Sequence, residues 1–209
     1  EAKKLGAVLI HYSTDYAYSG VARDNPYIES DPPAPISVYG KTKLAGDQAV
    51  ERSGASHLIF RASWVYSYKG KSFLRTILKL AEENNELRVV NDQIGTPTWC
   101  RSIAIGTEKI IKQLLDKNEG SLSKMVSGIS GVYHMTCGGQ TSWHGFAQAI
   151  LEQTGHDLTP QLLAISTNEY PALATRPAYS VLSNTKLKEV FGVKLPHWKE
   201  ALKQCLNTT

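Results

Sequence analysis

Tyr39 and Lys43 are the two residues whose types and spacing most clearly permit chemistry. Of the ten tyrosines, only Tyr39 has a lysine four positions further on. Positions four apart lie on one face of a helix, so the ammonium can approach the phenol and favour its ionised form. A free tyrosine has a pKa of about 10, and bringing it near 7 requires roughly 4 kcal/mol of differential stabilisation. The pair predicts a general acid, although a chance sharing of one helix face remains an alternative.

Two elements must position this pair and its neighbours. Residues 7–12 form an apolar run that predicts a buried strand, and residues 37–53 predict a helix with Ser37 as its N-cap. The strand delivers Ser13 and Thr14 at its carboxyl end, where open α/β sheets usually bind ligands. A hydroxyl there can meet the phenol. The alternative is that both hydroxyls only satisfy backbone groups at the strand exit.

Strand and helix patterns alternate along the rest of the chain, which predicts an α/β fold with a doubly wound, Rossmann-like parallel sheet. We expect this sheet to lie mainly within residues 1–157 and residues 158–209 to form a less regular carboxyl-terminal lobe. Further strands are expected at 57–64, 87–90 and 131–135, and further helices at 73–84, 103–117, 142–155, 184–190 and 198–206.

Composition excludes several classes of protein. The chain has 209 residues, 42% of them hydrophobic and 20% charged, which is enough for one ordinary core. No apolar run approaches the roughly 20 residues of a membrane span. The net charge is +4, but the basic residues are scattered, so we expect neither nucleic-acid nor membrane binding. Three cysteines without a paired motif, and no signal-peptide pattern, favour a cytoplasmic protein.

Several ordered motifs resemble one known family. The sequence is similar to the extended short-chain dehydrogenase/reductase superfamily and, within it, to the dTDP-4-dehydrorhamnose reductase family. One departure is the tripeptide Ala17-Tyr18-Ser19, where Val-Phe-Asp is more usual. The motifs that carry the resemblance are Ser13-Thr-Asp-Tyr-Ala-Tyr-Ser-Gly20, Pro26-Tyr-Ile-Glu29, Tyr39-Gly-Lys-Thr-Lys-Leu-Ala-Gly46, Arg61-Ala-Ser-Trp-Val-Tyr66, Asn91-Asp-Gln-Ile-Gly-Thr-Pro-Thr98 and Arg176-Pro-Ala-Tyr-Ser-Val-Leu182.

This resemblance implies an oxidoreductase of dTDP-rhamnose and O-antigen biosynthesis. It also implies that residues 1–157 are the carboxyl-terminal part of an NAD(P)-binding Rossmann-like domain with interleaved substrate-lobe segments, and that residues 158–209 are mainly a small mixed substrate-binding lobe. The implied reaction is NADPH-dependent reduction of the 4-keto group of dTDP-4-dehydro-6-deoxy-L-mannose to dTDP-L-rhamnose. Tyr39 would donate the proton to the ketone, and Lys43 would tune it while holding the nicotinamide ribose. Thr14 would hydrogen-bond the carbonyl oxygen. These three residues are the expected catalytic group.

The resemblance also implies binding residues. Ser13 and Ser63 would contact the cofactor together with Tyr39 and Lys43. The substrate would be bound by Thr14, Tyr16, Trp64, Gln93 and Arg176. Trp64 would pack on the sugar, although a role in the core is the alternative. Arg176 would clamp the pyrophosphate, and Gln93 would reach the nucleotide.

The amino-terminal part of the family's fold normally contains the cofactor-binding glycines. Members of the family are nearly a hundred residues longer there, so we expect the first strands of the sheet to be absent from this chain. None of its sixteen glycines forms the glycine-rich phosphate-binding motif of a dinucleotide fold. NADPH is therefore implied only by the resemblance, NADH remains an alternative, and a requirement for Mg²⁺ stays open. We expect no protein-bound metal at His134 and Cys137.

Other readings remain open. The chain can be another nucleotide-sugar reductase, epimerase or dehydratase, or a non-catalytic subunit resembling the regulatory subunit of methionine adenosyltransferase. A dehydratase needs a carboxylate near the threonine, and we expect the Asp15 side chain to point away from Thr14 because successive side chains of an extended backbone alternate. The small residues Gly40, Ala45 and Gly46 allow close helix packing and are compatible with a homodimer.

Overall fold

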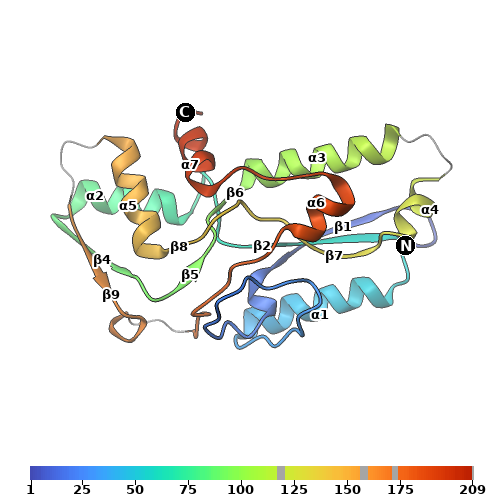
Figure 1. Ribbon diagram of the computed structural model, residues 1–209, viewed down its shortest axis with the longest axis horizontal. Helices are drawn as coiled ribbons and strands as arrows, with labels where there is room; N and C mark the ends of the chain where they lie inside the picture. The colour runs from blue at the N-terminus through green and yellow to red at the C-terminus, as the bar shows by residue number, and fades with distance from the viewer. Residues whose placement is uncertain (117–120, 156–159, 171–173, 209) are drawn as a thin grey trace.

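The computed structural model describes residues 1–116, 121–155, 160–170 and 174–208. Its centre is a parallel three-stranded sheet (Figure 1) in which β2 (His57–Ala62) lies between β1 (Leu9–Thr14) and β7 (Gly131–His134). All six residues of β2 are buried, as expected for a parallel strand covered on both faces. β2 ends two residues earlier than expected, because Trp64 adopts a positive φ of 44° that an extended strand does not allow.

Helices cover both faces of this sheet. The helix α1 (Val38–Arg52) lies on one face and α3 (Cys100–Asp116) on the other (Figure 1). The expected doubly wound α/β class is therefore confirmed. Ser37 is the N-cap of α1, as expected, and its hydroxyl accepts a hydrogen bond from the Gly40 N–H at 3.1 Å.

A second group of elements lies beside the central sheet. Here β4 (Glu86–Val90) pairs in parallel with β9 (Gln161–Ile165), and α2 (Phe73–Glu83) packs on α5 (Trp143–Thr154). Neither β9 nor the two-residue strands were expected from the sequence. The remaining elements are η1 (Asp15–Ala17), β3 (Val65–Tyr66), β5 (Ile94–Gly95), β6 (Thr98–Trp99), α4 (Leu122–Ser127), β8 (Thr141–Ser142), η2 (Thr167–Glu169), α6 (Thr185–Phe191) and α7 (Trp198–Leu206).

The expected boundary between residues 157 and 158 lies outside the described residues, as does Lys117 at the expected end of α3. The division of the chain into two domains therefore stays a prediction. The pairing of β4 with β9 nevertheless shows that segments on either side of this boundary form one small sheet.

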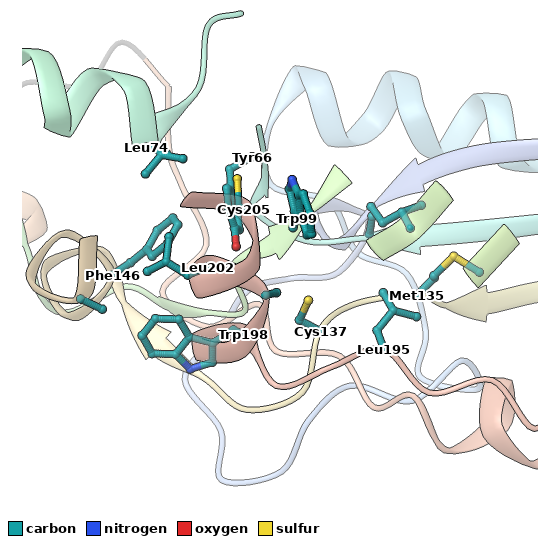
Figure 2. Packing of buried hydrophobic residues seen from close by; sticks show 14 of the residues in the cluster. Tyr66, Leu74, Trp99, Met135, Cys137, Phe146, Leu195, Trp198, Leu202 and Cys205 are labelled. Atoms are coloured by element: carbon teal, nitrogen blue, oxygen red, sulfur yellow. The ribbon is translucent and has the colours of Figure 1, made fainter. Parts of the chain in front are cut away.

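One hydrophobic core joins the two groups of elements. Figure 2 shows aromatic and aliphatic side chains from α5 and α7 meeting Tyr66 and Trp99 from the short strands. The three cysteines are free thiols, two of them buried in or beside this core. None of the helices in the described part of the chain is long and apolar enough to cross a membrane.

Candidate active site

Tyr39 and Lys43 lie on one helix, one turn apart, as their spacing predicts. The Lys43 ammonium donates a hydrogen bond of 2.7 Å to the backbone carbonyl of Tyr12, near the carboxyl end of β1. The Tyr39 side chain is 55% exposed, and its ring meets the Tyr16 ring edge-on at 5.8 Å between centroids. The helix thus presents an accessible phenol beside the residues that follow β1.

Gly40 allows this close approach of α1 to the turn η1. A Cβ at Gly40 would lie 2.3 Å from the Tyr16 carbonyl oxygen, a distance that no side chain tolerates. Gly46 faces inward as well, since its Cβ would lie 3.7 Å from the His11 imidazole. Both glycines are used for packing within the chain, and a homodimer stays a prediction.

The Asp15 side chain contacts Thr14, so the expectation that it points away was wrong. Thr14 Oγ1 donates to Asp15 Oδ1 at 3.0 Å, because the backbone leaves the extended conformation at Asp15, the first residue of η1. The Ser63 hydroxyl donates to the other carboxylate oxygen at 2.8 Å. Asp15 is only 3% exposed, and burial raises the pKa of its carboxyl group to about 6.

The two serines expected at the cofactor differ in their surroundings. Ser13 is buried at the end of β1, and its hydroxyl has no hydrogen-bond partner among the described residues. A buried hydroxyl without a partner is costly, so Ser13 is suited to bind a ligand. Ser63 is 1% exposed and its proton is used by Asp15. Its role toward a cofactor stays a prediction.

Two pockets adjoin next to these residues. One has a volume of about 590 Å³ and is lined by Tyr16, Tyr39 and the N-terminus of α1. The other, of about 390 Å³, is lined mainly by apolar side chains of α2 and β4, together with Gln93. Trp143 and Arg176 line both pockets and therefore lie between them.

Trp143 was missed by the sequence reasoning, and it changes the surroundings of Trp64. The two indole rings are stacked, 3.6 Å between centroids and 5° from parallel. Trp64 also lies against Gly95, where a Cβ would come within 2.3 Å of the indole. Trp143 is therefore the indole that lines the pockets, and a direct contact of Trp64 with a sugar stays a prediction. The available signal was the capping serine, Ser142, directly before Trp143.

Replacement of Gly95 by alanine is expected to lower the free energy of unfolding by about 1 to 3 kcal/mol, because the added methyl group pushes Trp64 out of its stack. Urea unfolding followed by tryptophan fluorescence measures this loss. Gly128→Ala is the matched control, since Gly128 has a φ of −73° and nothing within 4 Å of its Cβ position. Equal unfolding midpoints for the two variants would show that the stack does not depend on Gly95.

Gln93 and Arg176 both line the pockets, but Gln93 is buried and hydrogen-bonded whereas Arg176 is exposed. The Gln93 amide is 5% exposed, accepts from Trp143 Nε1 at 3.2 Å and donates to Thr167 Oγ1 at 3.1 Å. It fixes the walls of the apolar pocket. Arg176 is exposed and has no carboxylate within ion-pair distance in the described parts of the chain. Its guanidinium is therefore available to an anion between the two pockets.

A buried polar network fixes α1 on the sheet. Arg61 of β2 binds the Asp47 carboxylate of α1 through Nε at 3.2 Å and Nη2 at 3.1 Å, and donates to the Tyr18 hydroxyl at 2.9 Å. That hydroxyl lies 2.7 Å from His134 Nε2. Burial, and then the Arg61 charge, lower the pKa of His134 to about 3, so the ring is neutral. Tyr18 stands where phenylalanine is more usual in the family, and its hydroxyl gives this difference a structural role in the network.

Within the described residues, no group of three or more histidine, cysteine, aspartate or glutamate side chains is placed to hold a metal ion. The site therefore consists of a phenol, an ammonium, hydroxyls, a buried carboxyl group and a free guanidinium. This set of groups can bind an anion and give a proton to an oxygen atom.

Comparison with known proteins places this arrangement in a family. The model of the RmlD substrate binding domain matches residues 1–209, the entire chain. The chain belongs to the RmlD substrate binding domain family. Membership confirms the resemblance on which the site residues were assigned, although it does not test those residues one by one.

Relatives of this RmlD-family chain agree. A dTDP-4-dehydrorhamnose reductase of Burkholderia thailandensis is 45% identical over 98% of the chain and 68% of its own length. One from Shigella flexneri is 42% identical over 99% of the chain and 67% of its own length. The crystal structure of dTDP-4-dehydrorhamnose reductase from Bacillus anthracis in complex with NADP superimposes with a TM-score of 0.87 at 33% identity, covering 100% of this chain and 68% of that one.

Proposed function

We propose that the protein reduces the 4-keto group of dTDP-4-dehydro-6-deoxy-L-mannose with NADPH, giving dTDP-L-rhamnose. The observation that carries this proposal is the pair of adjoining pockets. The accessible Tyr39 phenol lines one pocket, the other is apolar, and Arg176 lines both. A nucleotide sugar has matching parts in the same order, namely a sugar, a diphosphate and a base.

The apolar pocket suits the base. Most of its walls are aliphatic and aromatic side chains, together with polar ones such as Thr76, Asn84 and Arg88. Its volume of about 390 Å³ lies within the range usual for small-ligand sites. Arg176 at the boundary suits the diphosphate, because a guanidinium binds phosphate oxygens in a bidentate manner. The sugar then lies in the larger pocket beside Tyr39 and Tyr16. Burial, and then the Asp15 charge, raise the pKa of Tyr16 to about 12, so Tyr16 remains protonated.

The residues present fit part of a nicotinamide cofactor. Ser13 offers a buried hydroxyl without a partner, and Lys43 uses one of its three protons on the Tyr12 carbonyl oxygen, which leaves two for ribose hydroxyls. The NADP complex of the Bacillus anthracis reductase supports NADPH over other cofactors. When bound, the cofactor supplies the hydride. A cytoplasmic location and a homodimer belong to the same proposal.

The protein's own groups provide the proton and stabilise charge. As hydride reaches the ketone carbon, negative charge develops on the ketone oxygen, and donors aimed at that oxygen help mainly in the transition state. Tyr39 gives its phenolic proton to this oxygen. Lys43, one turn further along α1, stabilises the phenolate that remains, because an ammonium favours a nearby anion.

An NADPH-oxidation assay with the keto sugar tests this function. The full-length protein is expected to consume one NADPH for each sugar reduced, as followed by absorbance and by mass spectrometry of the product. An epimerase or dehydratase would change the sugar without net consumption of NADPH. A non-catalytic subunit would leave both unchanged. Either of these outcomes contradicts the proposal.

A further inference from the structure

The proton of the Thr14 hydroxyl is already used inside the protein. Thr14 Oγ1 donates to Asp15 Oδ1 at 3.0 Å and accepts from the Tyr16 backbone N–H at 3.2 Å. A hydroxyl has only one proton, and an ionised carboxylate can only accept. While Asp15 is ionised, Thr14 therefore has no proton to offer a substrate carbonyl oxygen. Its use as a donor depends on the state of Asp15.

The hydrogen bonds of Asp15 indicate which of its two carboxylate oxygens would carry a proton. The Ser63 hydroxyl donates to Oδ2 at 2.8 Å, so that oxygen acts as an acceptor. Oδ1 faces Thr14 Oγ1 at 3.0 Å, so a proton on this oxygen would point at the Thr14 hydroxyl. With that proton in place, Asp15 becomes the donor and Thr14 Oγ1 the acceptor, because Oγ1 has two lone pairs and Tyr16 uses only one of them. The Thr14 hydroxyl can then donate its own proton in a hydrogen bond to another acceptor.

Resting on the proposed function, we propose that protonated Asp15 is a positioning residue for the reduction. Asp15 Oδ1–H donates to Thr14 Oγ1, and Thr14 in turn donates its own proton in a hydrogen bond to the ketone oxygen. No covalent bond is made or broken at either residue. Tyr39 remains the group that transfers a proton to the alkoxide, and Thr14 becomes a second donor to the developing charge.

The electrostatics of the site agree with this geometry. Burial raises the pKa of Asp15 to about 6, against the hydrogen bonds from Ser63, Ser180 and Thr14. Tyr16 of η1, next to Asp15, is acted on by the charges of Asp15 and Arg176 and by Tyr39 of α1. No charged side chain in the described structure is a cause of the Asp15 shift. About a tenth of the Asp15 carboxyls are then protonated at pH 7, and most are below pH 6. Activity that needs this proton falls as the pH rises through about 6.

The pH dependence of kcat/KM tests the proposal in the full-length enzyme with NADPH and the keto sugar. In Asp15→Asn, the amide donates to Thr14 and accepts from Ser63 at every pH. We expect wild-type kcat/KM to fall about tenfold per pH unit above its apparent pKa, and the Asp15→Asn profile to lack this decrease. Glu108→Gln, the same change at an exposed carboxylate of α3, is expected to keep the wild-type profile. A decrease that persists in Asp15→Asn would overturn the proposal.

A binding measurement gives a second readout that a purely structural role would not move. If the ketone oxygen accepts a hydrogen bond from Thr14, substrate binding must raise the protonated fraction of Asp15, since binding and protonation are linked. Calorimetry of keto-sugar binding to the NADP⁺ form at pH 7, in buffers of different ionisation enthalpy, should show uptake of a fraction of a proton. Asp15→Asn should show none, and Glu108→Gln should match the wild type.

The two tests separate this inference from the function. Absence of proton uptake by the wild-type protein overturns the role of Asp15 even when NADPH oxidation is normal. This result does not depend on the variant, so it holds even if Asp15→Asn fails to fold. Absence of NADPH oxidation with the keto sugar overturns the proposed function, whatever the state of Asp15.

Discussion

Tyr39→Phe is expected to lower kcat by about 10²- to 10⁴-fold, because general acid catalysis by a positioned side chain contributes a factor of that size. Binding of the nucleotide should change little, since the apolar pocket and Arg176 lie outside the altered group. The fold should also survive, because the phenol is exposed and lies at the surface of α1. Steady-state kinetics with NADPH and the keto sugar, together with calorimetry of dTDP binding, measure both effects.

Tyr68→Phe is the matched control for this variant. Tyr68 is a tyrosine outside the site, with the Arg75 guanidinium over its ring at 5.4 Å. Loss of its hydroxyl should leave kcat and KM unchanged. If intact protein carrying Tyr39→Phe reduced the sugar at the wild-type rate, Tyr39 would not be the proton donor.

Arg61→Met is expected to lower the free energy of unfolding by about 3 to 5 kcal/mol, because it leaves the Asp47 carboxylate buried without its main partner. Asp47 is 1% exposed, and the only other basic side chain within ion-pair distance of it in the described structure is the His11 imidazole, at 3.3 Å. A loss of this size is a large part of the stability of an ordinary domain. Urea denaturation of the wild type and the variant measures it.

Arg88→Met is the control for the loss of an arginine as such. Arg88 pairs with Glu169 on the surface at 3.3 Å, and exposed pairs contribute about 1 kcal/mol or less. The double variant Asp47→Leu/Arg61→Met should regain part of the lost stability, because it leaves no buried charge uncompensated. A cost for Arg61→Met no larger than that for Arg88→Met would show that the network does not hold α1.

The Arg61 network also bears on catalysis, since Asp47 lies one turn beyond Lys43 on α1. If the ion pair between α1 and β2 were lost and α1 shifted, Tyr39 and Lys43 would move with it. The geometry of the proton donor therefore depends on an ion pair that does not itself touch the pockets.

Local features of this protein were determined by the sequence alone. The strand at β2, the helix α1 with its Ser37 cap, and the placement of Tyr39 and Lys43 one turn apart all follow from periods and caps within about fifteen residues. The motifs around these residues also predicted the family, because motif residues keep their order along the chain whatever the fold brings together.

Contacts between distant segments were decided only by the tertiary structure. β4 pairs with β9 across some 75 positions, Trp143 stacks on Trp64, and Ser63 binds Asp15. Even the predicted direction of the Asp15 side chain was wrong, because η1 begins at Asp15, where an extended backbone was expected. Such contacts depend on which buried surfaces meet, and neither hydrophobic period nor residue spacing along one chain encodes that choice directly.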